Sequence, residues 1–451
     1  MRIHLIAIGG AVMHNLALAL QKNGHSVTGS DDEIYDPAKS RLEKAGLLPA
    51  ASGWYPEKIA PELDAVILGM HARPGNPELT QAHALGLPVF SFPEFIFQHA
   101  REKTRVVVAG SHGKTTTTAM IMHVLKQSGR DFDYLAGAQL EGFDAMVRLS
   151  DAPVMVIEGD EYLSSPIDRR PKFLHYRPQI AIITGIAWDH INVFPTFEEY
   201  KQQFGLFMET MSASGLLIFY EKDEHLQDLL KTARPFRQQP YSGFPYAIEA
   251  GKTVARPAGH PSCELQIFGA HNLANLQAAW FACRELGISE TDFWRAASTF
   301  KGAAKRLQLI AGKPGFNAWQ DFAHAPSKVK ATVDAVSQLY PERELVACVE
   351  LHTFSSLNKD FLPQYKGTLA AAGLATVFYS PHTLAMKNMP PIEPEEIRQK
   401  FGHPNLLVFT ERSTLEDFLS GQHWNGRNLL LMSSGTFGGM DYQKFVEKLR
   451  P

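Results

Sequence analysis

The segment Val106–Thr118 constrains the possible folds of this chain more than any other stretch. It begins with an apolar, β-branched run that predicts a buried strand, and the residues after it continue into a helical pattern. Between the two lies a glycine-rich turn with the sequence Ala109-Gly110-Ser111-His112-Gly113-Lys114-Thr115-Thr116. A strand, a glycine-rich turn and a helix N-terminus form a cradle in which backbone N–H groups and the helix dipole face a phosphate.

The side chains of this turn add the chemistry of a phosphate loop. Lys114 can neutralise a polyphosphate, and the hydroxyl of Thr115, the first after the lysine, can hold Mg²⁺. The strict phosphate-loop pattern requires a glycine where this chain has Val108, and a tight turn into an ordinary helix is the alternative. Gly-Lys-Thr at a strand-to-helix junction nevertheless favours phosphate binding. We expect a polyphosphate to contact seven residues: Gly110, Ser111, His112, Gly113, Lys114, Thr115 and Thr116.

Composition narrows the class of protein. The length of 451 residues is enough for three domains of about 150 residues each. With 44 basic and 47 acidic residues the net charge is −3, which gives no reason to expect nucleic acid as a partner. The three cysteines fit neither a disulfide framework nor a metal site, and no stretch is long enough for a membrane span. These features predict a cytoplasmic protein without a nucleic-acid or membrane partner.

The N-terminal region predicts a mononucleotide-binding βαβ unit. An apolar run over residues 3–8 is followed by Gly9, Gly10, Ala11 and a helical pattern, and a second strand over residues 26–30 ends at Asp31. The dinucleotide fingerprint is broken, because two of its three glycine positions hold other residues, which weakens an NAD-binding interpretation. A nucleotide diphosphate at the helix N-terminus still fits, and Asp31 could bind its ribose or base. A loop after the strand at residues 64–68 offers His71, Arg73 and Asn76 as further contacts, although polar loop residues usually face water.

Two further strands of the central region end in residues that bind metals. The run 153–157 ends in Glu158-Gly159-Asp160-Glu161, and an acid at the carboxyl end of a buried strand is where Mg²⁺ is usually held. We expect Glu158 to bind the metal, whereas a solvated acidic turn accounts for Asp160 and Glu161. The strand 179–184 ends near Asp189-His190. A lone histidine is more often structural than ligating, so His190 remains open from its position alone.

The last third of the chain predicts another α/β unit. It follows a helix that opens with His271, Asn272 and Asn275, whose polar groups could face an adenine edge or simply cap the helix. Five apolar runs separated by helical segments then predict strands Phe316–Gln320, Leu345–Val349, Ala375–Tyr379, Leu406–Phe409 and Asn428–Met432. A glycine-rich turn, 433–439, follows the last of them. We place the domains at residues 1–102, 103–301 and 302–451, which gives an α/β fold of two Rossmann-like domains around a central phosphate-loop domain.

In this order along the whole chain, the motifs resemble those of the Mur ligases, the ATP-dependent amide-forming enzymes of peptidoglycan assembly. The turn at Gly9-Gly10 with Gly29-Ser30-Asp31 is similar to the family's UDP-sugar domain, and the turn at Gly110–Thr116 is similar to its ATP loop. The remaining motifs of the resemblance are Glu158-Gly159-Asp160-Glu161, Asp189-His190, His271-Asn272-Leu273-Ala274-Asn275, Arg306 and Asp321-Phe322-Ala323-His324-Ala325-Pro326.

The resemblance implies the roles of the candidate residues. ATP would bind at Gly110–Thr116, with His271, Asn272 and Asn275 at the adenine and Arg306 and Asp321 near the phosphates. Thr115 and Glu158 would hold Mg²⁺, His190 would hold a second metal ion, and the catalytic residues would be Lys114, Glu158, His190 and Arg306. UDP-N-acetylmuramate would contact Gly9, Gly10, Ala11, Asp31, His71, Arg73 and Asn76. The amino-acid or peptide acceptor would contact His324, His352, Arg169 and Arg170, although a solvated loop is an equal alternative for the two arginines.

Within the family, the basic insertion 161–176 and the C-terminal glycine turn resemble the branch that attaches recycled L-Ala-γ-D-Glu-meso-diaminopimelate to UDP-N-acetylmuramate. The branch that adds L-alanine during peptidoglycan synthesis is the alternative. Phe204 stands where other Mur ligases have a carbamylated lysine, and the arginine expected near His352 is missing. An NAD-dependent oxidoreductase and a regulatory NTPase are the rival classes. The broken dinucleotide fingerprint opposes the first, and the third domain with its own glycine turn opposes the second.

Overall fold

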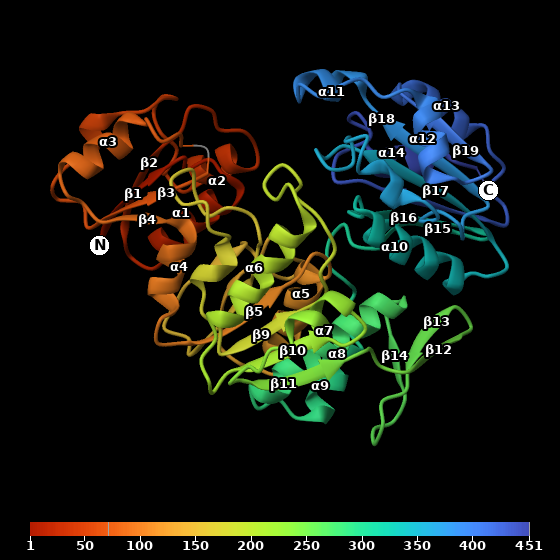
Figure 1. The fold of residues 1–451 in the computed structure, drawn as a ribbon, viewed down its shortest axis with the longest axis horizontal. Coiled ribbons are helices and arrows are strands. Elements are labelled where there is room, and N and C mark those ends of the chain that lie inside the picture. The colour runs from red at the N-terminus through yellow and green to blue at the C-terminus, as the bar shows by residue number, and fades with distance from the viewer. Residues whose placement is uncertain (71, 451) are drawn as a thin grey trace. The chain divides into compact units, whose positions relative to one another are not determined.

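The computed structural model describes residues 1–70 and 72–450 (Figure 1). The chain divides into two compact units, which are described separately. The first unit comprises Met1–Ile186, Glu198–Tyr241 and Ala278–Phe293. The second comprises Ala187–Phe197, Ser242–Gln277 and Trp294–Pro451. His71, one of the predicted UDP contacts, lies outside the described residues.

The N-terminal part of the first unit is a four-stranded parallel sheet, as the βαβ pattern predicts. Its strands, in spatial order, are β2 (Ser26–Ser30), β1 (Arg2–Ile6), β3 (Ala65–Leu68) and β4 (Val89–Ser91). Its helices are α1 (Ala11–Lys22), α2 (Ala38–Lys44), η1 (Pro56–Lys58), α3 (Pro77–Ala84) and α4 (Phe92–Ala100). The strand predicted over residues 3–8 ends two residues early, because Ala7 adopts a φ of 66° and turns the chain toward Gly9.

A seven-stranded sheet forms the rest of the first unit. Its spatial order is β11 (Arg237–Tyr241), β10 (Leu216–Tyr220), β9 (Ile180–Ile183), β5 (Thr104–Ala109), β8 (Val154–Glu158), β6 (Asp133–Leu135) and β7 (Val147–Arg148). All neighbours are parallel except β6 and β7. Helices α5 (Lys114–Gln127), α6 (Phe197–Glu209) and α7 (Glu224–Leu229), with η2 (Lys172–His175), connect its strands. The central strands read as continuous apolar runs because helices cover both faces of such a sheet.

The sequence pattern does not predict β6, β7 or β11, and the last two lack any apolar run. Strand β11 has the sequence Arg-Gln-Gln-Pro-Tyr, and only Tyr241 in it is buried. It lies at the edge of the sheet, where a proline is tolerated because one side of the strand needs no hydrogen-bond partner. Strand β7 has two residues. Neither presents the apolar run that makes a buried strand visible in a sequence.

The second unit contains a small antiparallel sheet and a large one. The small sheet consists of β12 (Tyr246–Glu249), β13 (Lys252–Ala255) and β14 (Cys263–Leu265), which pair antiparallel in sequence order. The large sheet has the order β15 (Gln308–Lys313), β16 (Phe316–Asp321), β20 (Arg427–Met432), β17 (Glu344–Leu351), β18 (Leu374–Tyr379) and β19 (Leu406–Phe409). Five of these strands are the predicted ones. The sixth, β15, is a mostly exposed edge strand that pairs antiparallel with β16.

Residues of the central strands alternate between two apolar cores on opposite faces of the large sheet. In β20, Leu430 and Met432 belong to one core, and Leu429 and Leu431 belong to the other. This alternation follows from the two-residue repeat of a strand. The helices that follow the strands of the large sheet are α10 (Pro326–Leu339), η3 (Leu362–Tyr365), α11 (Pro381–Met386), α12 (Pro394–Phe401), α13 (Arg412–Ser420) and α14 (Tyr442–Lys448). Helices α8 (Ala270–Glu285) and α9 (Glu290–Ala297) precede the sheet, and each has residues in both units. Helices α10 and α12 pack into the first core and α13 and α14 into the second, so both faces are covered.

The structure also gives the state of the cysteines and the character of the helices. The three cysteines are free thiols, and Cys283 and Cys348 are buried while Cys263 is partly exposed. Over residues 1–70 and 72–450, no helix combines the length and the apolar character needed to cross a membrane.

The doubly covered sheet predicts where a core substitution is costly. Leu430 is fully buried between helices and sheet, so Leu430→Ala is expected to lower the free energy of unfolding by about 2–5 kcal/mol. Leu309→Ala in the same sheet is the matched control, because Leu309 is 53% exposed. Thermal and urea unfolding of the full chain measure both. Equal destabilisation by the two substitutions would contradict the assignment of the core.

Candidate functional site

The backbone of the phosphate loop has the conformation that an anion cradle requires. Gly110 and Gly113 have φ values of 122° and 80°, and a Cβ on Gly110 would lie 2.2 Å from Thr184 Oγ1. Both positions therefore require glycine. Helix α5 begins at Lys114, has no side-chain N-cap and no acidic residue in its first turn. Its first N–H groups are consequently available to an anion.

Lys114 is held over this loop by a buried counter-ion. Its Nζ donates to Gly110 O and to Glu161 Oε2, both at 2.6 Å. The Glu161 side chain is 1% exposed, and Tyr200 Oη donates to its other oxygen at 3.1 Å. Although burial opposes the charged form, Glu161 and the neighbouring acids raise the pKa of Lys114. The lysine therefore stays positively charged where a phosphate would lie.

Glu161 and Tyr200 support the phosphate loop, and the sequence interpretation did not assign them a place in the site. The solvated acidic turn expected for Glu161 is wrong, because the side chain is buried against Lys114. A charged lysine in a largely buried loop requires an acidic partner. The acids that follow β8 were the sequence feature from which this partner could have been predicted. Tyr200 lies on α6, far along the chain, and also bonds to Ser111 Oγ at 2.7 Å. No local pattern marks it.

Glu158 and Thr115 form an oxygen-rich site beside the loop. Thr115 Oγ1 donates to Glu158 Oε1 at 2.7 Å, and the N–H of Gly137 donates to Glu158 Oε2 at 2.8 Å. A Cβ on Gly137 would lie 2.6 Å from Glu158 Oε1, so the glycine allows the carboxylate to lie against this backbone. Hydroxyl and carboxylate oxygens are the hard ligands that Mg²⁺ prefers. The two residues therefore fit the ion that the sequence predicts there.

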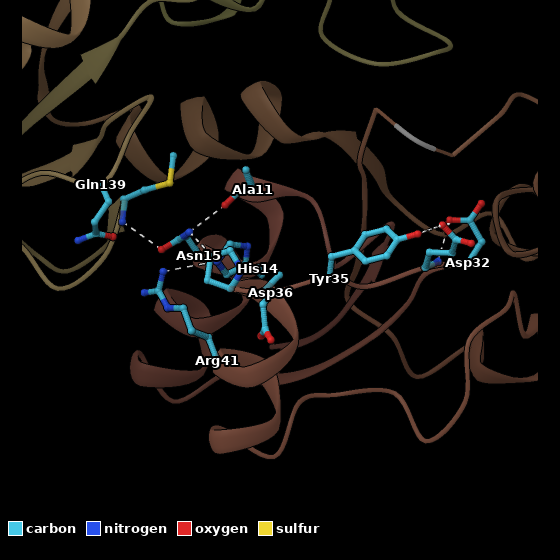
Figure 2. Close-up of a pocket in the computed structure, with 13 residues that line it drawn as sticks. Ala11, His14, Asn15, Asp32, Tyr35, Asp36, Arg41 and Gln139 are labelled. Atoms are coloured by element: carbon cyan, nitrogen blue, oxygen red, sulfur yellow. Dashed lines mark hydrogen bonds between the residues drawn. The ribbon is translucent and has the colours of Figure 1, made fainter. Parts of the chain in front are cut away.

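The N-terminal glycine turn borders a cavity of about 690 Å³ (Figure 2). The residues that line it are Gly9, Ala11, His14, Asn15, Asp32, Glu33, Tyr35, Asp36, Pro37, Ala38, Arg41, Gln139 and Met146. Figure 2 shows His14, Asn15 and Arg41 grouped near Gln139, with Tyr35 and Asp32 farther along the wall. Helix α1 begins at this cavity with Gly10 as its N-cap and without a side-chain cap. The cavity is large enough for a small-molecule ligand.

Two of the predicted nucleotide contacts in this region shape the backbone. Asp31 is 1% exposed, and its Oδ2 accepts from the N–H of Gly9 at 2.7 Å. Burial raises the pKa of Asp31 to about 6. Asn76 is the N-cap of α3, where its side chain accepts from the N–H groups of Glu78 and Leu79. Arg73 is exposed on the same loop. Direct contact of these residues with a ligand stays a prediction.

In the second unit, Asp189 and His190 lie in a strained turn beside Lys328. His190 has a φ of 55°, and its N–H donates to Asp189 Oδ1 at 2.8 Å. Lys328 Nζ lies 3.4 Å from Asp189 Oδ2. Burial alone would raise the pKa of Asp189, but Lys328 and the neighbouring histidines hold it well below its usual value. Backbone strain of this kind is concentrated at functional sites. A metal role for His190 stays a prediction.

Asp321 organises the segment that carries Arg306. Its two carboxylate oxygens accept from the N–H groups of Leu307 and Ala323, each at 2.6 Å. Leu307 has a φ of 44°, so this strained turn depends on the carboxylate. The Arg306 guanidinium lies 4.7 Å from the centre of the Phe322 ring, a cation–π distance. Asp321 thus orients the arginine-bearing loop.

Helix α8 opens with three polar residues, His271, Asn272 and Asn275. Asn272 Nδ2 donates to Phe268 O at 2.9 Å, which ties the first turn of α8 to the residue two positions before the helix. Asn275 is buried on the same helix. Burial lowers the pKa of His271 to about 4, so its ring is neutral and offers one donor and one acceptor. The adenine contact stays a prediction for all three.

The glycine turn 433–439 encloses a buried acid that the sequence did not single out. Glu350 Oε2 accepts from the N–H of Phe437 at 2.8 Å and also from Ser433 Oγ. His352 Nδ1 lies 3.8 Å from Glu350 Oε1, at the carboxyl end of the same strand. A Cβ on Gly435 would lie 3.0 Å from the His352 ring. The turn therefore packs directly against the predicted acceptor residue.

The two arginines of the basic insertion differ in their surroundings. Arg170 makes a bidentate pair with Asp168, and its Nη2 lies 3.6 Å from Glu94 Oε1. Asp168, Glu94 and His175 also present ligand atoms within 4.8 Å of one another, but the guanidinium already balances the two carboxylates. Arg169 is exposed and has no ion pair among the described residues. Of the two, only Arg169 is available to an acceptor without breaking a pair.

The comparisons with known proteins agree with this geometry. Residues 2–104 match the "Mur ligase family, catalytic domain", and residues 108–283 match the "Mur ligase middle domain". The UDP-N-acetylmuramate–L-alanyl-γ-D-glutamyl-meso-2,6-diaminoheptandioate ligase of Haemophilus influenzae is 29% identical over 99% of both chains. The UDP-N-acetylmuramate–L-alanine ligase of Desulforamulus reducens is 31% identical over 80% of this chain and 79% of its own.

A solved structure shows the same fold along the full length. The murein peptide ligase of Psychrobacter arcticus aligns with a TM-score of 0.67 at 24% identity, covering 100% of this chain and 98% of its own. The predicted three-domain α/β fold is confirmed by this match. The chain belongs to the Mur ligase family of ATP-dependent ligases.

Proposed function

We propose that this chain joins the lactyl carboxylate of UDP-N-acetylmuramate to the amine of the tripeptide L-Ala-γ-D-Glu-meso-diaminopimelate, with ATP as the energy source. The observation that carries the proposal is the phosphate loop with its paired, charged Lys114 in a chain that matches a tripeptide ligase from end to end. A second full-length relative with the same printed activity, from Escherichia coli, is 28% identical over 100% of this chain. Both are named for the tripeptide rather than for L-alanine.

The chemistry begins with two anions that repel each other. The muramyl carboxylate must attack the γ-phosphate of ATP to form an acyl phosphate, which the acceptor amine then attacks at carbon to release phosphate. Positive charge must therefore lie beside the transferred phosphoryl group. Lys114 and the N–H groups of α5 supply it from the loop. Thr115 and Glu158 would hold Mg²⁺, which adds further positive charge when bound. For Arg306 and His190 of the second unit, the family resemblance implies a phosphate contact and a second metal ion.

The neighbouring residues keep these groups in place. Glu161 holds the Lys114 ammonium over the loop, and Asp321 fixes the strained turn that carries Arg306. The acyl phosphate must be protected from water until the amine arrives. The proposed acceptor contacts are Arg169, His324 and His352. Of these, His324 is neutral because burial and the nearby Lys328 lower its pKa to about 3.

The first experiment compares acceptors directly. Phosphate release is measured with ATP, Mg²⁺ and UDP-N-acetylmuramate, together with either the tripeptide or L-alanine. Turnover is expected with the tripeptide and at least about tenfold less with L-alanine, a difference of about 1.4 kcal/mol in transition-state binding. The L-alanine ligase is the second candidate, because the Desulforamulus reducens relative carries that name. Activity with L-alanine alone would establish it, and no phosphate release with either acceptor would reject both.

The insertion gives a test of acceptor contacts. Arg169→Ala is expected to raise the KM for the tripeptide about tenfold, because a guanidinium–carboxylate pair contributes on the order of 1–2 kcal/mol. The KM for UDP-N-acetylmuramate should not change. Arg170→Ala is expected to have a smaller effect on tripeptide KM, because Arg170 is already paired with Asp168. Arg101→Ala, at a surface position that is 69% exposed, is the control. A larger effect at Arg170 than at Arg169 would contradict the assignment.

The neutral ring of His324 predicts a pH dependence of stability. Its Nδ1 lies 2.8 Å from Phe322 O, and the side chain is buried. Unfolding returns it to an ordinary pKa of about 6.5, so only the unfolded state binds a proton between about pH 6.5 and its folded pKa of about 3. The free energy of unfolding should therefore fall with decreasing pH, by up to about 1.4 kcal/mol per unit from this group. His324→Gln should flatten that slope in unfolding experiments from pH 7 to 4. The exposed control His423→Gln should not, and an unchanged slope in His324→Gln would contradict the prediction.

A further inference from the structure

One segment of the first unit contacts both the N-terminal cavity and the metal-binding carboxylate. The 137–146 segment lies between β6 and β7 of the central sheet. Its residues Gln139 and Met146 line the 690 Å³ cavity. At its other end, the N–H of Gly137 donates to Glu158 Oε2 at 2.8 Å. The position of this segment therefore affects both sites.

Asn15 anchors the segment to helix α1. The side chain is fully buried, and its Oδ1 accepts from the N–H of Met146 at 3.0 Å. Its Nδ2 donates to Ala11 O at 2.8 Å and lies 3.0 Å from His14 Nε2 (Figure 2). All hydrogen-bonding directions that the carboxamide uses point either to the first turn of α1 or to the segment. The same turn begins at the glycines that border the cavity.

His14 and Arg41 hold this arrangement in one orientation. His14 Nδ1 lies 2.9 Å from Gly10 O, and burial lowers the pKa of the ring. A neutral ring with its proton on Nδ1 leaves Nε2 to accept from Asn15 and from Arg41, whose Nη1 lies 3.4 Å away. Arg41 Nη2 also donates to Asp144 O at 3.1 Å. The segment is thus tied to α1 by Asn15 and to α2 by Arg41.

The Glu158 end of the segment tolerates little displacement. The two oxygens of Glu158 are divided between Thr115 and Gly137, at 2.7 and 2.8 Å. A Cβ on Gly137 would lie 2.6 Å from Oε1, so even a methyl group must push the carboxylate away. If the segment shifted, the hydrogen bond from Gly137 to Glu158 would break. The carboxylate would then be held by Thr115 alone and could rotate away from it. The orientation of Glu158 therefore depends on how firmly the segment is held.

We propose that Asn15 is a positioning residue that fixes the 137–146 segment, and that the segment couples occupancy of the N-terminal cavity to the orientation of Glu158. A ligand packed on Gln139 and Met146 restrains the segment and keeps the Gly137 N–H bonded to Glu158. The metal and nucleotide then bind to a carboxylate that is already ordered, so their binding loses less conformational entropy. Coupling between binding sites is reciprocal, so each ligand strengthens the other by the same factor. The inference rests on the proposed function in one respect: UDP-N-acetylmuramate is the cavity ligand.

The test measures binding rather than turnover. Calorimetry gives the Kd of Mg²⁺ with the non-hydrolysable ATP analogue AMP-PCP, without and with saturating UDP-N-acetylmuramate. In the unmodified chain the sugar nucleotide is expected to tighten analogue binding at least about fivefold, the lower range of typical coupling between sites. In Asn15→Ala the factor should fall below about twofold. The matched control is Asn23→Ala, an exposed asparagine at the end of the same helix, which should keep the full factor.

A second variant acts at the other end of the segment and does not depend on the fold around Asn15. Gly137→Ala should weaken Mg²⁺–AMP-PCP binding at least about fivefold, while UDP-N-acetylmuramate binding stays within twofold of the unmodified value. Full coupling in a folded Asn15→Ala chain would overturn the proposal, as would unchanged analogue affinity in Gly137→Ala or the absence of coupling in the unmodified chain. Because no turnover is needed, a chain that couples its ligands but forms no amide would reject only the proposed function. An active ligase without coupling would reject only this inference.

Discussion

The phosphate loop depends on keeping a partly buried lysine charged. The Lys114 side chain is 15% exposed, and its ion pair with Glu161 meets this requirement. An unpaired ammonium in a protein interior loses most of its hydration, and such a group usually responds by releasing its proton. Glu161 offsets this loss at 2.6 Å, and Tyr200 holds the carboxylate in place. A neutral lysine would leave the γ-phosphate without its nearest positive charge. Through Lys114, Glu161 at the end of β8 is thus connected to the proposed phosphate site.

The same strand end explains how metal and lysine sites share one short stretch. Glu158 is the last residue of β8 and faces Thr115, while Glu161, three residues later, faces Lys114. Asp160 between them pairs with Lys172 of the insertion, at 2.5 Å. Because β8 lies beside β5 in the sheet, its carboxyl end delivers these acids to the loop that follows β5. The parallel register of two neighbouring strands therefore determines which acid meets which partner.

Local patterns sufficed for the elements whose residues carry their own signal. The phosphate loop, Glu158 at a strand end and five strands of the C-terminal sheet follow from apolar runs and turn residues adjacent in sequence. Residues that matter through distant neighbours gave no such signal: Tyr200 reaches Glu161 from another helix, Gly137 is one glycine among many, and Asn15 reads as an ordinary helical residue. Strands β11 and β15 were missed for a related reason, because exposed edge strands need no apolar run. Arg170 was expected at the acceptor, but its pair with Asp168 depends on a loop geometry that spacing does not reveal.

The N-terminal turn shows how a chain with a broken glycine fingerprint still forms a tight turn beside a cavity. Glycines in that fingerprint permit tight turns and close approach of the backbone to the ligand. Here Ala7 takes the left-handed conformation itself, at a φ of 66°, and Asp31 compensates by accepting the N–H of Gly9. Gly69 lets the neighbouring strand end approach closely, since a Cβ there would lie 3.1 Å from that of Ala7. The turn is therefore stabilised by a buried side chain rather than by glycine alone. The side chains of Asn15 on α1 and Arg41 on α2 connect this region to the central sheet through hydrogen bonds to Met146 and Asp144, and His14 contacts Asn15. Glycine has no side chain that could make these bonds.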